Sequence, residues 1–220
     1  MKGDLLYMEL SALAYEKPEY VKAMAPKLGY QMNTFLNDGS SQGYLFKGKR
    51  CAVLAYRGTE ASEGDLWDIM SNLRFHAREW EGPGKAHLGY VRQYRRIRDE
   101  LMKVVKGVSG GIPLVVTGHS MGGAIATMAA ADAYQRDWKF SRVVTFGSPA
   151  TMNAEGHAAI TCERTRYVNC MDPVPLWPPS FTINHGVPAT KINSETSVFN
   201  RHASPAYLRA MKNYEEKLNA

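Results

Sequence analysis

One serine has the neighbours that a catalytic nucleophile needs. Ser120 is the centre of the pentapeptide Gly118-His119-Ser120-Met121-Gly122, which follows the apolar run 114–117 and precedes the small-residue run 123–130. These runs predict a strand and a helix, so the serine lies on the turn between them. Such a sharp turn exposes the hydroxyl, and glycine on either side avoids steric clashes. The pattern predicts Ser120 as the nucleophile of an acyl-transfer reaction.

A serine nucleophile needs a base, and the base needs a carboxylate to orient it. Asp172 directly follows a predicted strand over 165–170, which places it at a strand's carboxyl end as the acid. His157 precedes Asp172 and therefore does not fit the chain order serine, acid, histidine. His185 and His202 both fit this order. We favour His202, which lies on a loop just before the last predicted helix, whereas His185 fits a structural hydrogen bond.

The predicted strands and helices that must position these residues indicate an α/β fold. Strands are predicted at 43–47, 51–56, 112–117, 142–146 and 165–170, with another entered at Val187. Helices are predicted at 4–16, from Pro18, at 87–106, at 121–135 and from Ser204, the predicted N-cap of the last helix. The polar residues 37–40 are expected to form a turn. Strands that alternate with helices indicate a mostly parallel central sheet with helices on both faces. Residues 1–220 are expected to form a single domain.

Composition narrows the function classes. Of 220 residues, 45% are hydrophobic and 22% are charged, and the net charge is +6. The basic residues are scattered, so a nucleic-acid partner is not expected, although the charge would favour contact with anionic lipid surfaces. Three cysteines indicate neither a disulfide framework nor a zinc site, and no metal or cofactor is expected. Neither a signal peptide nor a membrane-spanning run is recognised. We therefore expect a cytoplasmic protein, with export by another route left open.

An ordered set of motifs resembles the class 3 lipase family, whose members include fungal triacylglycerol lipases. The matching segments are Val53-Leu-Ala-Tyr-Arg-Gly-Thr59, Asp68-Ile-Met-Ser-Asn-Leu73, Ala86-His-Leu-Gly-Tyr90, the serine turn through Gly123, Phe146-Gly-Ser-Pro149, Asp172-Pro-Val-Pro, and His202 followed by Tyr207. The last pair has two more intervening residues than the family pattern. The resemblance implies the α/β-hydrolase fold and a catalytic Ser120, Asp172 and His202.

The resemblance also implies an oxyanion hole and a lid. Thr59 and the backbone N–H of Met121 would donate to the developing oxyanion. Residues 60–75 correspond to the family's lid, and the apolar side chains expected to cover an acyl pocket are Leu66, Trp67, Ile69 and Met70. A surface helix that packs on the core is the alternative for this segment. Ile69 stands where the family usually has a tryptophan.

Together these features predict a lipase or esterase that hydrolyses lipid esters of the acylglycerol type through an acyl-enzyme. The substrate would be a lipid or a small ester, with transient contact to lipid surfaces; the oligomeric state is not predicted. Two alternatives remain: a phospholipase-type effector that damages membranes, and a catalytically silent relative that binds lipid or a protein partner. The complete order of serine, acid and histidine argues against the silent relative.

Overall fold

The computed structural model describes residues 3–39, 41–59, 76–108, 111–134, 139–197 and 200–219. Within these residues, seven strands form one sheet in the order β1-β2-β3-β6-β7-β8-β9. The first three strands pair antiparallel, and the pairs from β3–β6 to β8–β9 are all parallel. The strands are β1 (Tyr30–Asp38), β2 (Ser41–Gly48), β3 (Ala52–Tyr56), β6 (Leu114–His119), β7 (Arg142–Phe146), β8 (Glu163–Asn169) and β9 (Thr190–Ile192). A separate two-stranded sheet contains β4 (Ala77–Glu79) and β5 (Lys85–His87).

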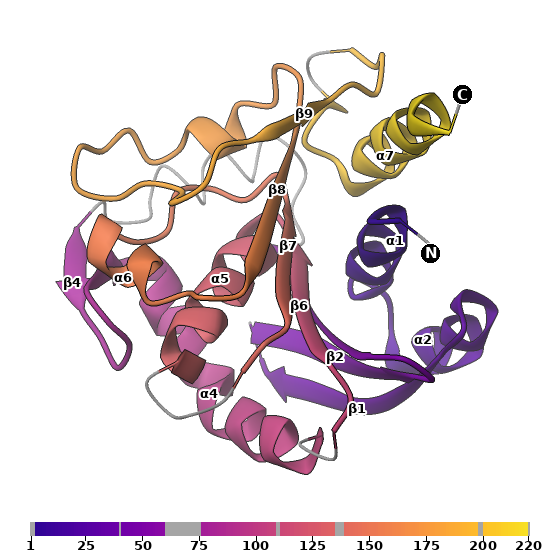
Figure 1. Cartoon of the computed structure of the whole chain (residues 1–220), viewed down its shortest axis with the longest axis horizontal. Helices are drawn as coiled ribbons and strands as arrows, with labels where there is room; N and C mark the ends of the chain where they lie inside the picture. Colours follow the sequence, from indigo (N-terminus) through magenta and orange to yellow (C-terminus); the bar gives the residue numbers. More distant parts are fainter. Residues whose placement is uncertain are drawn as a thin grey trace.

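Helices cover both faces of the central sheet, as predicted (Figure 1). One face carries α1 (Leu5–Leu13), α2 (Pro18–Met24) and α7 (Ser204–Leu218), and the opposite face carries α4 (Leu88–Val108), α5 (Met121–Tyr134) and α6 (Ala154–Ala158). The short helices η1 (Ala25–Leu28) and η2 (Val174–Leu176) lie in the connections. The first and last helices lie side by side, and the backbone N–H of Leu5 in α1 donates to the Glu215 carboxylate in α7 at 2.7 Å.

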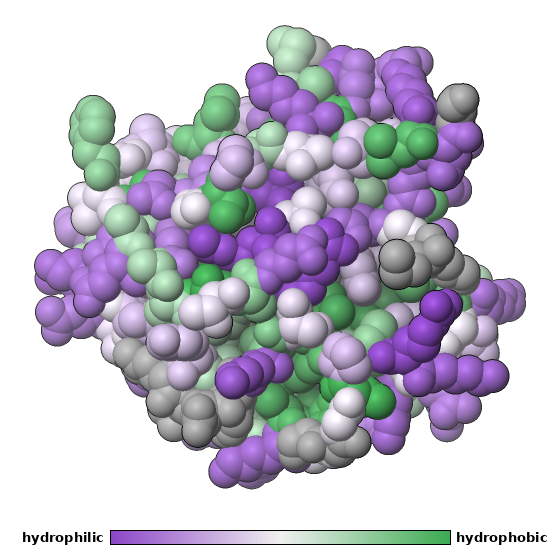
Figure 2. Space-filling view, in the orientation of Figure 1, coloured by the Kyte–Doolittle hydropathy of each residue, from purple (hydrophilic) through white to green (hydrophobic). Residues whose placement is uncertain are grey.

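Alternating side chains of the central strands supply two hydrophobic cores. On β3, Leu54 and Tyr56 pack in the core under α4 and α5, whereas Val53 and Ala55 pack in the core under α1 and α7. This alternation follows from the two-residue period of a strand. Both faces of the inner strands are therefore buried, which explains their nearly continuous apolar sequence. On the face shown in Figure 2, hydrophilic residues form most of the rim and hydrophobic ones gather in the lower middle.

Four local expectations need correction or fall outside the described residues. Strand β1 was not predicted, because it is an edge strand whose exposed polar residues mask the alternation; the turn expected at 37–40 begins only after Asp38. The strand expected at Val187 begins at Thr190. Helix α7 already includes Ser204, so its N-cap is Ala203, without a side-chain hydrogen bond. The expected lid, residues 60–75, lies outside the described residues.

Candidate active site

Ser120 lies on the tight turn between β6 and α5. Its φ of 58° is in the left-handed region, which is strained for a residue with a side chain and is often found at functional sites. The backbone N–H of Ser120 donates to the carbonyl of Phe146 at 2.9 Å, which ties the turn to β7. A Cβ on Gly118 would overlap the backbone of Gly122, and a Cβ on Gly122 would overlap the carbonyl of Tyr56. Gly118 is therefore required for the turn to close on itself, and Gly122 for the turn to pack against β3.

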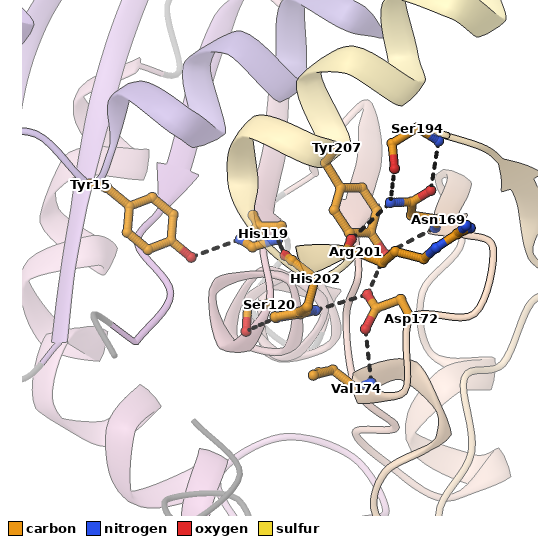
Figure 3. Close-up of polar contacts among 10 residues, drawn as sticks. All are labelled: Tyr15, His119, Ser120, Asn169, Asp172, Val174, Ser194, Arg201, His202 and Tyr207. Atoms are coloured by element: carbon orange, nitrogen blue, oxygen red, sulfur yellow. Dashed lines mark hydrogen bonds and ion pairs between the residues drawn. The ribbon is translucent and has the colours of Figure 1, made fainter. Parts of the chain in front are cut away.

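The structure brings the three residues predicted for catalysis into one hydrogen-bonded row (Figure 3). The Ser120 hydroxyl lies 2.8 Å from Nε2 of His202, and Nδ1 of His202 lies 2.8 Å from Oδ2 of Asp172. All three residues are buried. Because an ionised carboxylate only accepts hydrogen bonds, Nδ1 of His202 carries the proton and Nε2 accepts from the serine hydroxyl. This tautomer is the one that a general base requires.

Asp172 is held at both carboxylate oxygens. Its Oδ1 accepts from the backbone N–H of Val174 at 2.9 Å, and its Oδ2 accepts from the Tyr207 hydroxyl at 2.6 Å as well as from His202. Burial first, and then the nearby Asp172 carboxylate, raise the pKa of Tyr207 well above its usual value, so this hydroxyl stays protonated and donates. The Tyr207 oxygen also accepts from the backbone N–H of Asn169 at 3.0 Å. The orientation of the acid is thus fixed from three elements: β8, η2 and α7.

The other two candidate histidines point elsewhere. Nε2 of His185 donates to the carbonyl of Pro175 at 2.7 Å, and Nε2 of His157 donates to the carbonyl of Asn184 at 2.9 Å. Burial is the main cause that lowers the pKa of each to about 4, so both are neutral near pH 7. Both histidines therefore make structural hydrogen bonds.

Three residues that support the site were not singled out from the sequence. The side-chain amide of Asn169 donates to the carbonyl of Arg201 at 2.8 Å, next to His202. His119 contacts the His202 carbonyl, and Tyr15 contacts His119 (Figure 3). His119 lies within the serine pentapeptide, but its type is not constrained by that pattern. Tyr15 lies far before the serine in the sequence and carries no local motif that would have identified it.

The residues predicted for the oxyanion hole lie next to the turn. The Thr59 hydroxyl is 3.6 Å from the sulfur of Met121, and Met121 is the first residue of α5. Backbone N–H groups in the first turn of a helix have no acceptor within that helix and favour negative charge. The predicted acyl-pocket residues Leu66, Trp67, Ile69 and Met70 lie outside the described residues.

The described residues contain neither a metal-binding cluster nor a membrane-spanning helix. No group of three or more histidine, cysteine, aspartate or glutamate side chains in those segments is arranged to hold a metal ion. No helix in the same segments combines the length and apolar character needed to cross a membrane.

Comparison with solved structures supports the fold. Lipase II from Rhizopus niveus aligns with a TM-score of 0.72 at 23% sequence identity, over 89% of this chain and 80% of that chain. The Rhizomucor miehei lipase propeptide complex aligns with a TM-score of 0.71 at 23% identity, over 86% of this chain and 67% of that chain. At this level of identity the likeness concerns the fold, and it confirms the predicted α/β-hydrolase architecture.

Sequence comparison identifies the family. Residues 53–182 match the family described as Lipase (class 3). A lipase from Rhizopus niveus is 30% identical over 172 residues, which is 71% of this chain and 43% of that protein. The secreted mono- and diacylglycerol lipase A of Penicillium cyclopium is 35% identical over 98 residues, which is 42% of this chain and 32% of that protein. The match thus spans less than half the length of either relative.

The prediction of a cytoplasmic protein is wrong by this comparison, because relatives of this chain are named secreted lipases. That prediction rested on the lack of a recognised signal peptide or membrane-spanning run, and neither observation determines the compartment in which a protein works. The prediction of the family is confirmed by both the matched segment and the relatives: the chain belongs to the class 3 lipases.

Proposed function

We propose that this protein is a serine hydrolase that cleaves carboxylic esters of acylglycerol-type lipids. The observation that carries the proposal is the buried row from the Ser120 hydroxyl through His202 to Asp172, with two hydrogen bonds of 2.8 Å. The names of the relatives, which include mono- and diacylglycerol lipases, support the choice of an acylglycerol ester as substrate.

In the first half of the reaction, the Ser120 oxygen attacks the ester carbonyl while Nε2 of His202 takes the hydroxyl proton. Asp172 stabilises the imidazolium that forms. The negative charge that develops on the carbonyl oxygen is stabilised by the Met121 backbone N–H at the start of α5, together with Thr59. His202 then returns the proton to the leaving alcohol, which leaves Ser120 acylated.

In the second half, water replaces the alcohol. His202 removes a proton from the water as it attacks the acyl-enzyme, and the same oxyanion donors stabilise the second tetrahedral intermediate. Collapse of that intermediate releases the fatty acid and returns the proton to Ser120. Every step uses groups of the protein and water.

Exposed apolar side chains in the chain segment that contains Asp172 support a lipid as the partner. The segment that follows β8 carries three exposed apolar side chains: Met171 and Leu176 are 68% and 78% exposed, and Phe181 is fully exposed. Met171 has a φ of 64°, in the left-handed region that a side chain rarely adopts, and it immediately precedes Asp172. Exposed apolar groups in the segment that carries the proposed acid fit contact with an aggregated lipid. We therefore expect the enzyme to act at lipid surfaces, and the names of its secreted relatives support a site of action outside the cell.

The direct test is hydrolysis of p-nitrophenyl esters of increasing acyl length by the wild-type protein and by Ser120→Ala. We expect activity in the wild type and its loss in the variant, and the preferred chain length then separates an esterase from a lipase. A comparison of the rate of hydrolysis of mono- or diacylglycerol with the rate on phospholipid vesicles separates an acylglycerol lipase from a phospholipase. Equal rates with and without the Ser120 hydroxyl would contradict the proposal.

A further inference from the structure

His119 is a buried histidine next to the nucleophile, and both of its ring nitrogens are engaged. Its Nε2 lies 2.7 Å from the backbone carbonyl oxygen of His202, and its Nδ1 lies 2.8 Å from the hydroxyl of Tyr15. Tyr15 follows the end of α1, which lies on the sheet face opposite α5. The two side chains therefore connect the amino-terminal segment of the chain to the backbone of the catalytic histidine (Figure 3).

These partners fix the tautomer of His119. A carbonyl oxygen only accepts, so Nε2 of His119 carries a proton and donates a hydrogen bond to the backbone carbonyl of His202. The unprotonated Nδ1 then accepts from the Tyr15 hydroxyl. Burial is the largest cause that holds the pKa of His119 well below its usual value, and the neighbouring His202 lowers it further. His119 therefore stays neutral and does not place a second positive charge beside His202 when that residue takes the serine proton.

The contact holds His202 in two ways. First, His119 anchors its carbonyl while Asn169 anchors the preceding carbonyl, of Arg201, at 2.8 Å, so two successive peptide groups are fixed by buried side chains. Second, the rings of His119 and His202 lie with centroids 4.8 Å apart and planes 30° apart. The imidazole of His202 is thus supported from one side by His119 and at Nδ1 by Asp172.

Tyr15 also contacts the segment that leads to the predicted oxyanion donor. A Cβ on Gly58 would overlap the Tyr15 hydroxyl, so the backbone at Gly58 passes directly over that group. The guanidinium of Arg57 lies 6.0 Å from the centroid of the Tyr15 ring. One tyrosine therefore contacts the backbone before Thr59 and, through His119, the backbone of His202.

We infer that Tyr15 and His119 form a positioning pair. The pair fixes the position of the base His202 relative to the oxyanion segment at Gly58 and Thr59. The inference rests on the proposed function, because it assigns His202 and Thr59 their catalytic roles. Neither Tyr15 nor His119 takes part in bond making. Their effect on rate comes from geometry, since reacting groups displaced by about 1 Å can lose about a hundredfold in rate.

Four variants test the pair. Tyr15→Phe removes one hydroxyl, His119→Phe removes both ring nitrogens, and His119→Gln retains an amide N–H that can donate to the His202 carbonyl. Tyr44→Phe is the matched control, because the Tyr44 hydroxyl donates at 2.8 Å to the carbonyl of Glu16, one residue beyond Tyr15. The control removes a comparable hydrogen bond from the same part of the chain without touching His119.

Kinetics on a soluble ester separate positioning from general stability. We expect Tyr15→Phe to lower kcat about fivefold, as for loss of one neutral hydrogen bond, with KM within about twofold of the wild type. His119→Phe should lose about a hundredfold in kcat, and His119→Gln should recover most of that loss. Tyr44→Phe should keep the wild-type kcat. Equal kcat values for Tyr15→Phe, His119→Phe and the wild type would overturn the inference.

A second measurement does not depend on turnover. The imidazole nitrogen resonances of His119 and His202 report tautomer and hydrogen bonding directly. We expect His119 as the neutral Nε2–H form in the wild type, and shifted His202 resonances in Tyr15→Phe but not in Tyr44→Phe. Unchanged His202 resonances in Tyr15→Phe would overturn the positioning role even in an active enzyme. If the wild type hydrolyses no ester, the proposed function fails, and these resonances still decide whether the pair holds His202.

Discussion

Replacing Asp172 with asparagine removes a charge while keeping much of the geometry around it. Both carboxylate oxygens accept hydrogen bonds: Oδ1 from Val174, and Oδ2 from Tyr207 and His202. An amide must therefore turn its NH₂ toward a donor at one of these positions. If it faces Val174, one hydrogen bond is lost; if it faces Tyr207 and His202, two are lost. We expect the first orientation, in which the asparagine oxygen still accepts from Nδ1 of His202.

The loss of charge sets the size of the effect. With Nδ1 of His202 2.8 Å from Oδ2 of Asp172, the two charge centres in the transition state lie about 4 Å apart. At an effective dielectric constant of about 20, this attraction amounts to ~4 kcal/mol. That energy corresponds to a loss of about a thousandfold in kcat.

The assay is kcat on a soluble p-nitrophenyl ester, with Asp132→Asn as the matched control. Asp132 is also a fully buried aspartate, bonded at 2.7 Å to Arg98 and at 2.8 Å to Tyr94, but it lies near the carboxyl end of α5, away from Ser120. We expect Asp132→Asn to lower the thermal stability and to leave kcat nearly unchanged. An Asp172→Asn enzyme that retains kcat within tenfold of the control would refute the assignment of Asp172 as the acid.

Three further predictions concern the proposed oxyanion donor Thr59, the exposed apolar segment after β8 and the buried His87. Thr59→Val should lower kcat on soluble esters about a hundredfold, because a hydroxyl donor aimed at the oxyanion is worth about 3 kcal/mol. Thr59→Ser keeps the hydroxyl and should retain most of the wild-type kcat. Equal kcat values for the two variants would argue against this role of Thr59. Phe181→Ser should reduce hydrolysis of emulsified diacylglycerol several-fold while leaving soluble esters unaffected, since the Phe181 side chain is fully exposed; equal loss on both substrates would contradict a role in lipid contact. The free energy of unfolding should fall as the pH drops from 6.5 toward 4, because burial lowers the pKa of His87 from 6.5 to about 4 and the unfolded chain therefore takes up the proton first. In denaturant titrations at several pH values, the free energy of unfolding of His87→Leu should depend less steeply on pH than that of the wild type. An equally steep dependence in the variant would contradict this prediction.

The sequence was most informative where local backbone geometry or burial restricts which residue types are allowed. The glycines around Ser120 are required by the turn, so their spacing in the sequence was enough to place this serine on a tight strand-to-helix turn and to predict it as the nucleophile. Chain order and strand ends then selected Asp172, because the carboxyl ends of parallel strands meet at one edge of the sheet. The inner strands of the sheet were visible for a similar reason: burial on both faces leaves a continuous apolar run.

Other features of the fold and the site could not be predicted, because they depend on contacts between residues far apart in the sequence or on position in the sheet. Strand β1 lies at an edge of the sheet and keeps polar side chains, so its periodicity is weak. Two histidines satisfied the chain order, and only the fold shows that His185 binds the carbonyl of Pro175 while His202 reaches Ser120. Tyr15 contacts His119 across 104 positions of sequence. No local pattern encodes such a contact, because it depends on how α1 packs against the sheet.

The most direct test of the account is the site of covalent capture by a fluorophosphonate, read by mass spectrometry of the digested protein. We expect one adduct, on the peptide that contains Ser120, formed by the folded wild type and absent from both Ser120→Ala and the denatured protein. The rate of capture should fall in His202→Ala, because Nε2 of His202 accepts a hydrogen bond of 2.8 Å from the Ser120 hydroxyl. No adduct on the folded wild type, or equal labelling of Ser120→Ala, would contradict the assignment of Ser120 as the nucleophile.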